Sequence, residues 1–438
     1  LSEQEIIRRN SMNELRAMGI EPYPAAEYVT NAFSTDIKAE FNDDAEPRQV
    51  SVAGRIMSRR IMGKASFIEL QDSKGRIQVY ITRDDICPDE DKEMYNTVFK
   101  RLLDLGDFIG IEGFVFRTQM GEISIHAKKL TVLAKSIKPL PIVKYKDGVA
   151  YDSFEDPELR YRQRYVDLIV NDGVKEKFLK RATVIKTMRA VLDEAGYTEV
   201  ETPILQSIPG GASARPFITH HNSLDIDLYL RIATELYLKR LIVGGFEGVY
   251  EIGKNFRNEG MDKNHNPEFT CMELYVQYKD YNWMMSFTEK LLERICIAVN
   301  GCTETEIDGK SISFKAPYRR LPILEAIKEK TGYDLEGKSE DEIRQVCKEL
   351  NMEIDDTMGK GKLIDEIFGE FCEGTFIQPT FITDYPVEMS PLTKMHRSKP
   401  GLTERFELMV NGKELANAYS ELNDPIDQEE RFKEQLKL

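Results

Sequence analysis

Four side chains that could bind a small charged ligand are spaced by even numbers of residues in the middle of the chain. Arg257, Phe269, Glu273 and Tyr275 occupy odd positions in two strand-like runs that a polar loop joins. Because side chains alternate between the faces of a strand, we expect all four on one kind of face. The opposite face of the second run is apolar, with Met272, Leu274 and Val276. This polar face, which we call the floor, suits a ligand with an anion, a planar ring and a cation. For each charged residue, the alternative is a structural ion pair.

A second group of polar side chains is expected on the outside of a small β-barrel. The apolar residues that alternate along its strands point inward: Val50, Val52, Ile56, Ile68, Leu70, Ile77, Val79 and Ile81. The same alternation turns Arg55, Phe67, Glu69 and Gln78 outward. Unpaired bases stack on aromatic rings, while amide and charged groups read their edges. This face therefore predicts an RNA-binding surface, unless another domain covers Phe67.

The net charge of the chain restricts where RNA could bind. At −15, the average surface repels a polyanion, so an RNA site must be a local basic patch. No acidic residue lies between Pro47 and Ile68, a segment with five basic residues: Arg48, Arg55, Arg59, Arg60 and Lys64. The alternative is an ordinary solvated face.

The composition indicates a protein of several domains whose cysteines are reduced. At 438 residues the chain exceeds one ordinary core. No apolar stretch approaches the roughly 20 residues that span a membrane, so we expect no membrane partner. The six cysteines are scattered without a C-x-x-C pair, which argues against a zinc site and a disulfide scaffold. We expect a cytoplasmic protein with free thiols.

The elements that must position these residues form a multidomain α+β protein. We expect an N-terminal helical arm, a small barrel, a linker and a larger α+β domain, over residues 1–45, 46–136, 137–160 and 161–438. Ser2 and Glu5 have the spacing of a capping box at the start of the arm. The barrel segment has period-two patterning and five strands, a count typical of an OB fold. A generic β-barrel without a ligand is the alternative.

Several motifs resemble the class II aminoacyl-tRNA synthetases. Gly196-Tyr197-x-x-Val200-x-x-Pro203 is similar to motif 1 of that family, and Phe256-Arg257-Asn258-Glu259 with His265-Asn266-Pro267-Glu268-Phe269 is similar to motif 2. Four stretches resemble the lysine-specific branch, the lysyl-tRNA synthetases: Arg160–Tyr165, Pro209–Ala212, Arg231–Tyr237 and Met272–Tyr275. The resemblance covers nearly the whole chain. It implies an OB-fold anticodon-binding barrel followed by a class II catalytic domain, an antiparallel sheet flanked by helices.

The same resemblance implies the reaction and an ATP site. The activity would be ATP-dependent activation of L-lysine to lysyl-adenylate, then transfer to the 3′ end of lysine tRNA. Arg257 would be the catalytic residue, holding the α-phosphate and the substrate carboxylate. Glu259, His265 and Asn266 would lie along the ATP, and Phe269 would stack on adenine.

Lysine-binding positions come from the resemblance as well. Glu235 would take the α-ammonium group, and Glu273 with Tyr275 would take the ε-ammonium group. Gly211 would lie on the loop that closes over the amino acid. A carboxylate in a closed pocket rejects uncharged amino acids, because an unpaired buried charge costs several kcal/mol.

A hairpin near the end of the sequence carries the implied metal site. Asn411-Gly412 lies between two strand-like runs and is a strong turn signal. The resemblance makes Glu414 and Glu421 the ligands of Mg²⁺, and it makes Asn417 and Glu421 lysine-pocket residues. A spacing of seven would place the two glutamates on opposite faces of a straight strand. We therefore expect either a β-bulge between them or a strand that ends before Glu421.

The barrel and the assembly have counterparts in the family too. Arg55, Phe67 and Gln78 match anticodon-contacting positions. The motif 1 region implies a homodimer built on the helix and strand around Pro203. The third class II motif, a glycine-rich strand and helix whose arginine holds the γ-phosphate, has no counterpart in the sequence. We expect a protein that ends at Leu438 to make no lysyl-adenylate, while its barrel still binds the anticodon arm.

Three other interpretations remain open. An aspartate or asparagine enzyme of the same subclass shares the barrel and motifs, but an acidic substrate needs a cation where Glu273 stands. A relative that attaches lysine-like groups to a translation factor lacks the barrel. A protein that binds RNA without catalysis and has kept this fold is the third.

Overall fold

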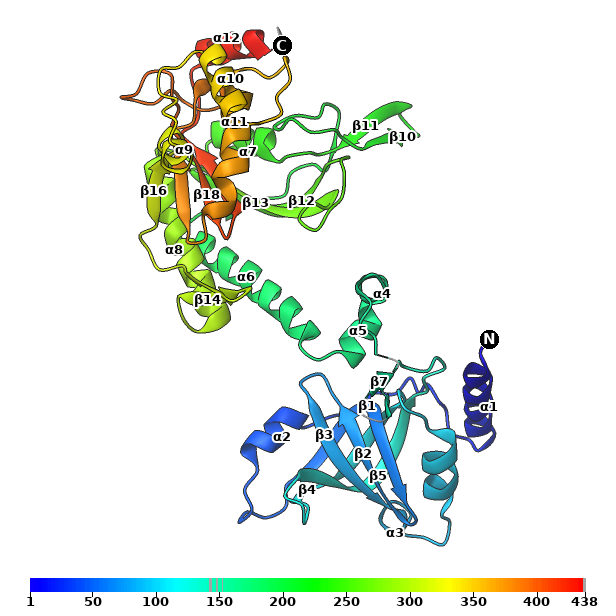
Figure 1. Cartoon of the computed structure of the whole chain (residues 1–438). Helices are drawn as coiled ribbons and strands as arrows, with labels where there is room; N and C mark the ends of the chain where they lie inside the picture. The colour runs from blue at the N-terminus through cyan, green and yellow to red at the C-terminus, as the bar shows by residue number, and fades with distance from the viewer. Residues whose placement is uncertain (142–143, 147–148, 152, 436–438) are drawn as a thin grey trace. The chain divides into compact units, whose positions relative to one another are not determined.

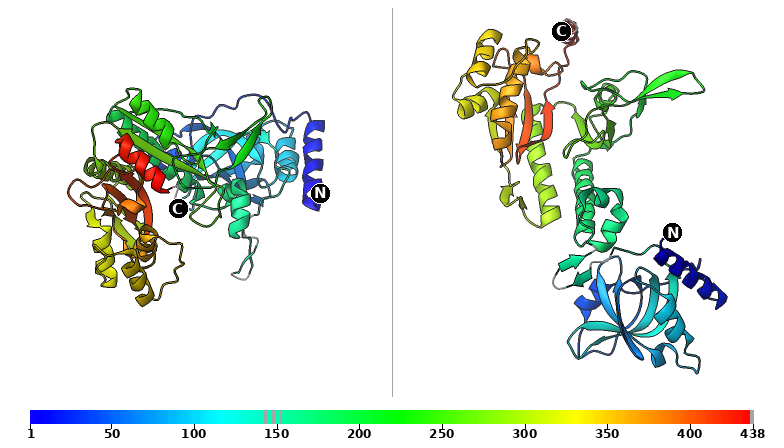
Figure 2. Two further views of the ribbon diagram at one scale, coloured as in Figure 1. Left: turned by 90° about the horizontal axis from the view of Figure 1, so that it is seen from above. Right: turned by 45° about the vertical axis from the view of Figure 1, so that its right-hand side comes forward.

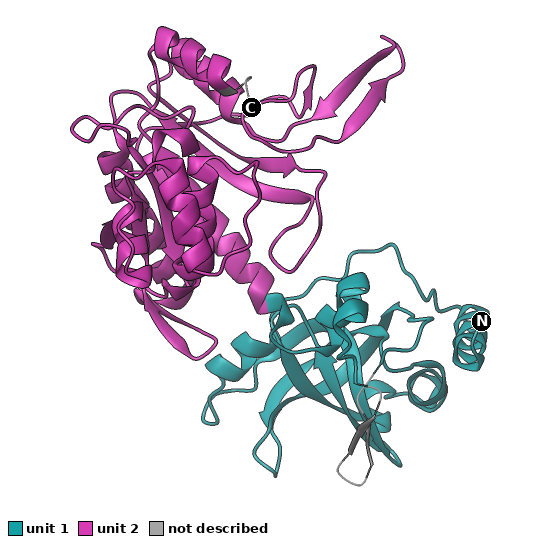
Figure 3. Cartoon of the chain, turned by 45° about the horizontal axis from the view of Figure 1, so that its top comes forward, with its two compact units in different colours: residues 1–175 teal, residues 176–438 magenta. Residues whose placement is uncertain are grey.

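The computed structural model describes residues 1–141, 144–146, 149–151 and 153–435. It contains two compact units, residues 1–175 and 176–438 (Figure 3). The expected linker, 137–160, falls in part on residues outside the described ones, namely 142–143, 147–148 and 152. Its boundaries, like those of the other expected domains, stay predictions.

The first unit is built on a closed five-stranded barrel (Figure 1). The strand order is β1-β2-β3-β5-β4, with bounds Gln49–Met62, Ala65–Gln71, Arg76–Thr82, Ile123–Ala134 and Phe108–Arg117 in that order. All eight apolar residues that the alternation turned inward are buried. Removing such a side chain from water contributes roughly 1.5–3 kcal/mol. The predicted OB-type barrel is therefore confirmed.

Helical segments surround the barrel. Their bounds are α1 Glu3–Ala17, α2 Ser34–Glu40, α3 Arg83–Ile86, α4 Pro157–Arg162, α5 Arg164–Val170 and the π-helix η1 Met94–Leu102; a short hairpin pairs β6 Lys144–Lys146 with β7 Val149–Tyr151. The predicted capping box of Ser2 and Glu5 opens α1. The views in Figure 2 show α1 beside the barrel, where Arg8 donates to the carbonyl oxygens of Leu105 (3.1 Å) and Ser136 (2.9 Å). The sequence patterns did not predict η1, which buries Tyr95, Val98, Phe99 and Leu102.

Strands of the second unit form two larger sheets and two smaller ones. One sheet has the order β13-β12-β8, over Glu268–Val276, Gly248–Phe256 and Thr198–Glu199. The other has the order β16-β17-β18-β19, over Arg319–Pro322, Thr380–Thr383, Arg405–Val410 and Lys413–Tyr419. The smaller sheets are β10-β11-β9 (Ile218–His221, Ile226–Leu230, Leu205–Gln206) and β14-β15 (Glu304–Ile307, Lys310–Ser313). Pairing in this unit is antiparallel except at β8–β12 and β16–β17.

Helices flank these sheets. Their bounds are α6 Val174–Glu194, α7 Glu235–Val243, α8 Tyr281–Asn300, α9 Ile323–Thr331, α10 Glu340–Glu349, α11 Lys360–Phe371 and α12 Pro425–Gln435, with 3-10 turns at Glu373–Thr375 and Val387–Met389. One apolar core joins α9, α10 and α11 to β16 and β17, and a second lies between α8 and the strands β17 and β18. In the described ranges, no helix is both long and apolar enough to cross a membrane.

Candidate active site and nucleic-acid interface

The expected floor forms on β12 and β13. These strands pair antiparallel with Glu251 opposite Glu273 and Asn255 opposite Phe269, so the odd positions share one face. Burial, and then the nearby carboxylate of Glu273, raises the pKa of the Cys271 thiol to about 11 on this face. The shared face predicted from parity is therefore confirmed by the strand register.

Arg257 lies at one end of this floor. It follows the last residue of β12, and its backbone N–H donates to the carbonyl oxygen of Pro267 over 2.8 Å. Its guanidinium carbon lies 5.2 Å from the centroid of the Phe269 ring. Its Nε is buried without a hydrogen-bond partner among the described residues. A buried donor without a partner is costly, and an anionic ligand would satisfy it.

Acidic and phenolic side chains lie farther along the floor. The Tyr275 hydroxyl donates to Oε2 of Glu273 over 2.9 Å, and the Tyr419 hydroxyl donates to Oε1 of Glu235 over 2.7 Å. Burial raises the pKa of Glu273 above its ordinary value, and the nearby Glu235 carboxylate adds to that rise. Burial, followed by Glu273 and Glu235, raises the pKa of Tyr275 well above its usual range. The structure thus brings three of the expected lysine-pocket residues together, namely Glu235, Glu273 and Tyr275, and it adds Tyr419.

Glu235 and Glu421 are connected by Lys239, a residue that the sequence patterns did not single out. The ammonium group of Lys239, one turn after Glu235 on α7, forms ion pairs with both carboxylates. Gly211 lies against the same helix, because a Cβ atom added to it would lie 3.3 Å from the Cβ atoms of Ala233 and Glu235. Its backbone φ of +87° favours glycine. The only sequence signal for Lys239 was its i, i+4 spacing from Glu235.

The motif 2 loop holds the other expected ATP residues, which are exposed. His265 Nδ1 lies 2.8 Å from Oδ2 of Asp262, and this contact with backbone hydrogen bonds lowers the pKa of Asp262 to about 2. The amide of Asn266 donates to the carbonyl oxygen of Glu268 over 2.6 Å. These contacts shape the loop and leave the ATP roles of both residues as predictions.

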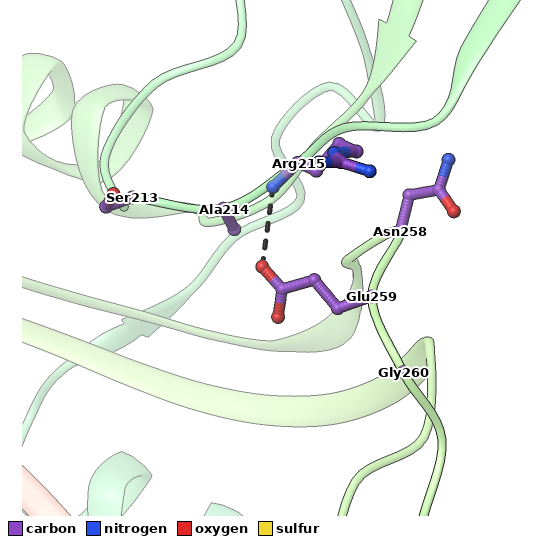
Figure 4. A pocket seen from close by; sticks show the side chains of 6 residues that line it. All are labelled: Ser213, Ala214, Arg215, Asn258, Glu259 and Gly260. Atoms are coloured by element: carbon purple, nitrogen blue, oxygen red, sulfur yellow. Dashed lines mark hydrogen bonds between the residues drawn. The ribbon is translucent and has the colours of Figure 1, made fainter. Parts of the chain in front are cut away.

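An open pocket separates this loop from the loop after Gly211 (Figure 4). Residues 213–215 line one side and residues 258–260 the other. In Figure 4 the carboxylate of Glu259 points toward the backbone N–H of Arg215, which donates to it over 3.4 Å. Arg215 is exposed, and no sequence motif pointed to it.

The hairpin of β18 and β19 resolves the seven-residue spacing of the two glutamates. Asn411 and Gly412 have φ values of 50° and 71°, as a tight hairpin turn requires. The register shifts so that Leu415 is an extra residue, and β19 ends at Tyr419, before Glu421. Both expected solutions, a bulge and an early strand end, therefore occur together.

The residues of this hairpin differ in their surroundings. Partial removal from water, together with the Glu407 carboxylate, raises the pKa of Glu414 to about 7. Asn417 accepts from Arg405 Nε over 3.4 Å. The described part of the chain contains no group of three or more His, Cys, Asp or Glu side chains arranged to hold a metal ion. Mg²⁺ commonly uses one or two carboxylates with water and substrate phosphates, so the metal roles of Glu414 and Glu421 stay predictions.

A buried ion pair lies on the same face of the floor, because Glu251 is opposite Glu273 in the strand pairing. Arg231 is 1% exposed and Glu251 is 5% exposed, and Nη1 of the arginine lies 2.7 Å from Oε1 of the glutamate. Arg231 also donates to the carbonyl oxygens of Lys254 (2.8 Å) and Thr202 (3.0 Å). The hydroxyl of Thr202 donates to Glu251 over 2.6 Å. This network ties β12 to the segment that follows β8.

On the barrel, Phe67 and Gln78 line one groove of about 1150 Å³. Phe67 is paired across the strands with Tyr80, with ring centroids 4.9 Å apart, and both rings are half-buried. Gln78 donates to Ser124 Oγ over 3.2 Å. The cation beside Phe67 is Arg60, whose guanidinium carbon lies 5.7 Å from the ring centroid. The groove thus offers stacking rings, an amide and a cation.

Arg55 lies half-buried on the expected outward face of β1, but it is not among the residues that line this groove. Its Nη1 donates to the carbonyl oxygen of Gly106 over 2.9 Å, and its guanidinium lies 4.2 Å from the ring centroid of Phe108. The register of β1 shifts between Ile56 and Ser58, so that Arg60 pairs with Phe67. A bulge of this kind reverses the alternation, and simple parity cannot detect it.

Comparison with known proteins gives two family matches and several close relatives. The family model described as tRNA synthetases class II (D, K and N) matches residues 156–438, and that of the OB-fold nucleic acid binding domain matches residues 50–133. Three relatives, each named Lysine–tRNA ligase, match over the whole of this chain. The Porphyromonas gingivalis W83 protein is 70% identical over 440 residues, 76% of its length. The proteins of Azobacteroides pseudotrichonymphae and Christiangramia forsetii are 65% and 64% identical, over 88% and 77% of their lengths.

The motifs, the two matched domains and the identity to these relatives agree with one another. This chain therefore belongs to the lysine–tRNA ligase family of class II aminoacyl-tRNA synthetases.

Proposed function

We propose that this enzyme activates L-lysine with ATP as lysyl-adenylate and transfers the lysyl group to the 3′ end of lysine tRNA. The observation that carries the proposal is the composition of one sheet face. A guanidinium group with a buried, unpaired Nε lies over a phenyl ring at one end, and carboxylates with phenols lie farther along. The guanidinium group suits the phosphates of ATP, the phenyl ring suits adenine, and the carboxylates suit the two ammonium groups of lysine.

The residues of the floor support the first step through charge and position. A carboxylate oxygen of lysine attacks the α-phosphorus of ATP, the bond to the β-phosphate oxygen breaks, and pyrophosphate leaves. Repulsion between the two anions is the main obstacle, and the guanidinium of Arg257 is placed to reduce it. In-line placement of the two reactants supplies further acceleration without a protein nucleophile.

Transfer to tRNA completes the proposed reaction. A hydroxyl group of the terminal ribose attacks the carbonyl carbon of the adenylate, AMP leaves, and the hydroxyl proton is lost. The barrel groove supports recognition of the anticodon, because Phe67, Tyr80 and Gln78 offer rings for stacking and an amide for base edges. Arg60 adds a cation close to the stacked base.

The charge of the pocket favours lysine over the substrates of related enzymes. Three carboxylates, Glu235, Glu273 and Glu421, lie near Tyr275, Tyr419 and Lys239. An aspartate or asparagine side chain would leave Glu273 without a counter-charge. A translation-factor-modifying relative lacks the barrel that this chain has. We therefore assign Glu235 to the α-ammonium group, Glu273 with Tyr275 to the ε-ammonium group, and Asn417 to the pocket wall.

Magnesium completes the proposed ATP site. Glu414 and Glu421 would hold Mg²⁺, which neutralises phosphate charge when it is bound. Burial and then the Glu407 carboxylate raise the pKa of Glu414, and a bound cation would favour its ionised form. Glu259, His265 and Asn266 would border the ATP from the motif 2 loop.

We also propose a homodimer through the motif 1 region. Leu179 on α6 is 56% exposed, and Ile204 and Leu205 after β8 are 42% and 49% exposed. These exposed apolar side chains lie on the helix before motif 1 and on the segment after it, and exposed apolar surface suits a protein interface. Light scattering at micromolar concentration should give twice the mass of one chain, and the mass of a single chain would contradict the dimer. We place the enzyme in the cytoplasm, where its six free cysteines would stay reduced.

Lysine-dependent ATP–pyrophosphate exchange tests the proposed function. The intact protein should catalyse exchange with L-lysine and with none of the other nineteen amino acids at a comparable rate. Arg257→Ala should abolish exchange while the protein stays folded by circular dichroism. Exchange that depends on aspartate or asparagine, or no binding of L-lysine at all, would contradict the proposal.

A further inference from the structure

Lys239 occupies an unusual position in the lysine pocket, and its role in that pocket rests on the function proposed above. Its ammonium group contacts Glu235, four residues earlier on α7, and Glu421, which lies beyond the end of β19. The Lys239 side chain is 23% exposed, and that of Glu235 is 9% exposed. An exposed i, i+4 pair contributes only about 0.2–0.5 kcal/mol to a helix. Lys239 differs from such a pair in being largely buried and in having a second acceptor from another element.

The two carboxylate oxygens of Glu235 differ in the hydrogen bonds that they accept. Nζ of Lys239 donates to Oε1 of Glu235, and the Tyr419 hydroxyl donates to the same atom over 2.7 Å. Among the described residues, the hydrogen bonds from Lys239 and Tyr419 both end on Oε1 and leave Oε2 of Glu235 without one. Two donors on one oxygen fix the plane of the carboxylate. The other oxygen is left for a ligand.

The charges around Lys239 support the same division. Without it, the carboxylates of Glu235 and Glu421 would have no cation between them. Its ammonium group lies within ion-pair distance of both carboxylates and so offsets part of their negative charge.

We propose that Lys239 is a positioning residue for the amino acid: together with Tyr419 it holds Oε1 of Glu235, so that Oε2 accepts the α-ammonium group of the incoming lysine. It also keeps Glu421 beside Glu235 by bridging the two carboxylates. Lys239 makes no contact with the substrate in this arrangement and acts through Glu235.

The test compares two ligands that differ only at the group Glu235 would hold. L-Lysine carries the α-ammonium group, and 6-aminohexanoic acid is the same molecule without it. Dissociation constants are measured by calorimetry for L-lysine and by competition for 6-aminohexanoic acid. The variants are Lys239→Met, Lys239→Gln and Lys239→Arg. The matched control is Lys433→Met, which breaks an exposed i, i+4 pair with Glu429.

Lys239→Met should raise the Kd for L-lysine at least tenfold, about 1.4 kcal/mol, and change the Kd for 6-aminohexanoic acid by less than about twofold. Lys239→Arg should recover part of the lost affinity, because it restores a cation, and Lys433→Met should match the wild type. If Lys239→Met does not fold, Lys239→Gln, which keeps a donor but no charge, should show the same selective loss.

Three outcomes would overturn the inference and leave the proposed function standing. They are an unchanged Kd for L-lysine, an equal loss for both ligands, which would show a merely structural role, and tighter binding of L-lysine, which would make Lys239 a competitor for the pocket. A wild-type protein that does not bind L-lysine would overturn the proposed function and this inference together.

Discussion

The hydroxyl group of Tyr275 donates a 2.9 Å hydrogen bond to Oε2 of Glu273, two residues earlier on the same face of β13. Burial of Glu273 raises its pKa, so the carboxylate is held in a site that disfavours its own charge. A cationic ligand would relieve that cost. This relationship makes Glu273 the residue on which lysine selectivity should depend most.

Glu273→Gln should therefore weaken lysine binding far more than ATP binding. The amide keeps the shape of the side chain and can still accept from Tyr275, but it removes the counter-charge of the ε-ammonium group. Losing a charged hydrogen bond in a closed pocket costs several kcal/mol, so the Kd for lysine should rise by about two orders of magnitude. Calorimetry with L-lysine and with ATP measures both effects, and an unchanged Kd for lysine would remove Glu273 from the ε-ammonium site.

The affinity for lysine should also depend on pH through the same carboxyl group. Binding requires ionised Glu273, whose pKa is raised, so affinity should fall as the pH drops through a range above the ordinary glutamate value of about 4.3. In the ligand-free protein the sign is opposite. The folded state binds more protons than the unfolded state in this window, so stability falls as the pH rises through the raised pKa.

Urea unfolding of wild type and Glu273→Gln at pH 5 and pH 8 separates this effect from other titrations. The variant should gain stability relative to the wild type as the pH rises, because glutamine carries no charge to bury. The same stability difference at both pH values would show that Glu273 has an ordinary pKa in the folded protein.

Anticodon binding should depend on Phe67 and Arg60. Phe67→Ala should weaken binding of a lysine-tRNA anticodon stem-loop by about 1–3 kcal/mol through lost stacking. Arg60→Ala should weaken binding and reduce its salt dependence if the cation contacts a phosphate. Arg55→Ala is the charge-matched control, since Arg55 is held by Gly106 and Phe108 outside the groove. Fluorescence anisotropy at several salt concentrations measures the affinity of all three variants. A larger loss of affinity for Arg55→Ala than for Arg60→Ala would contradict the assignment of the groove to anticodon binding.

The stability of the second unit should depend on the Arg231–Glu251 pair. Glu251→Ala leaves a buried guanidinium group without its counter-charge, which should cost about 3–5 kcal/mol in the free energy of unfolding. Glu194→Gln is the control, because its pair with Arg294 is exposed and should change stability far less. Urea denaturation measures the free energy of unfolding of both variants. Similar losses would mean that burial of the Arg231–Glu251 pair contributes little to stability.

Local patterns in the sequence predicted much of this fold. Period-two alternation identified the eight inward residues of the barrel, because one face of each strand is apolar. The Asn411-Gly412 pair identified the hairpin, since both residues take positive φ values. Parity alone placed Phe269, Glu273 and Tyr275 on one face of β13. In each case the determining interaction is local.

Features that depend on distant residues could not be predicted in this way. The bulge after Ile56 places Arg60 opposite Phe67 at the groove, and only the pairing of β1 with β2 shows it. Lys239 has the spacing of a surface ion pair with Glu235, and its burial depends on Tyr419 and Glu421 from the far end of the chain. The individual ligand-binding roles came from the family resemblance and stay proposals until they are measured.

A crystal structure of the protein soaked with L-lysine tests the proposed lysine pocket most directly. We expect the ε-ammonium nitrogen within about 3 Å of a Glu273 carboxylate oxygen. The α-ammonium group should lie beside Glu235, and the carboxylate should point toward Arg257. Lysine bound in the opposite direction, or electron density for lysine away from the face of β13, would contradict the assignment of these residues.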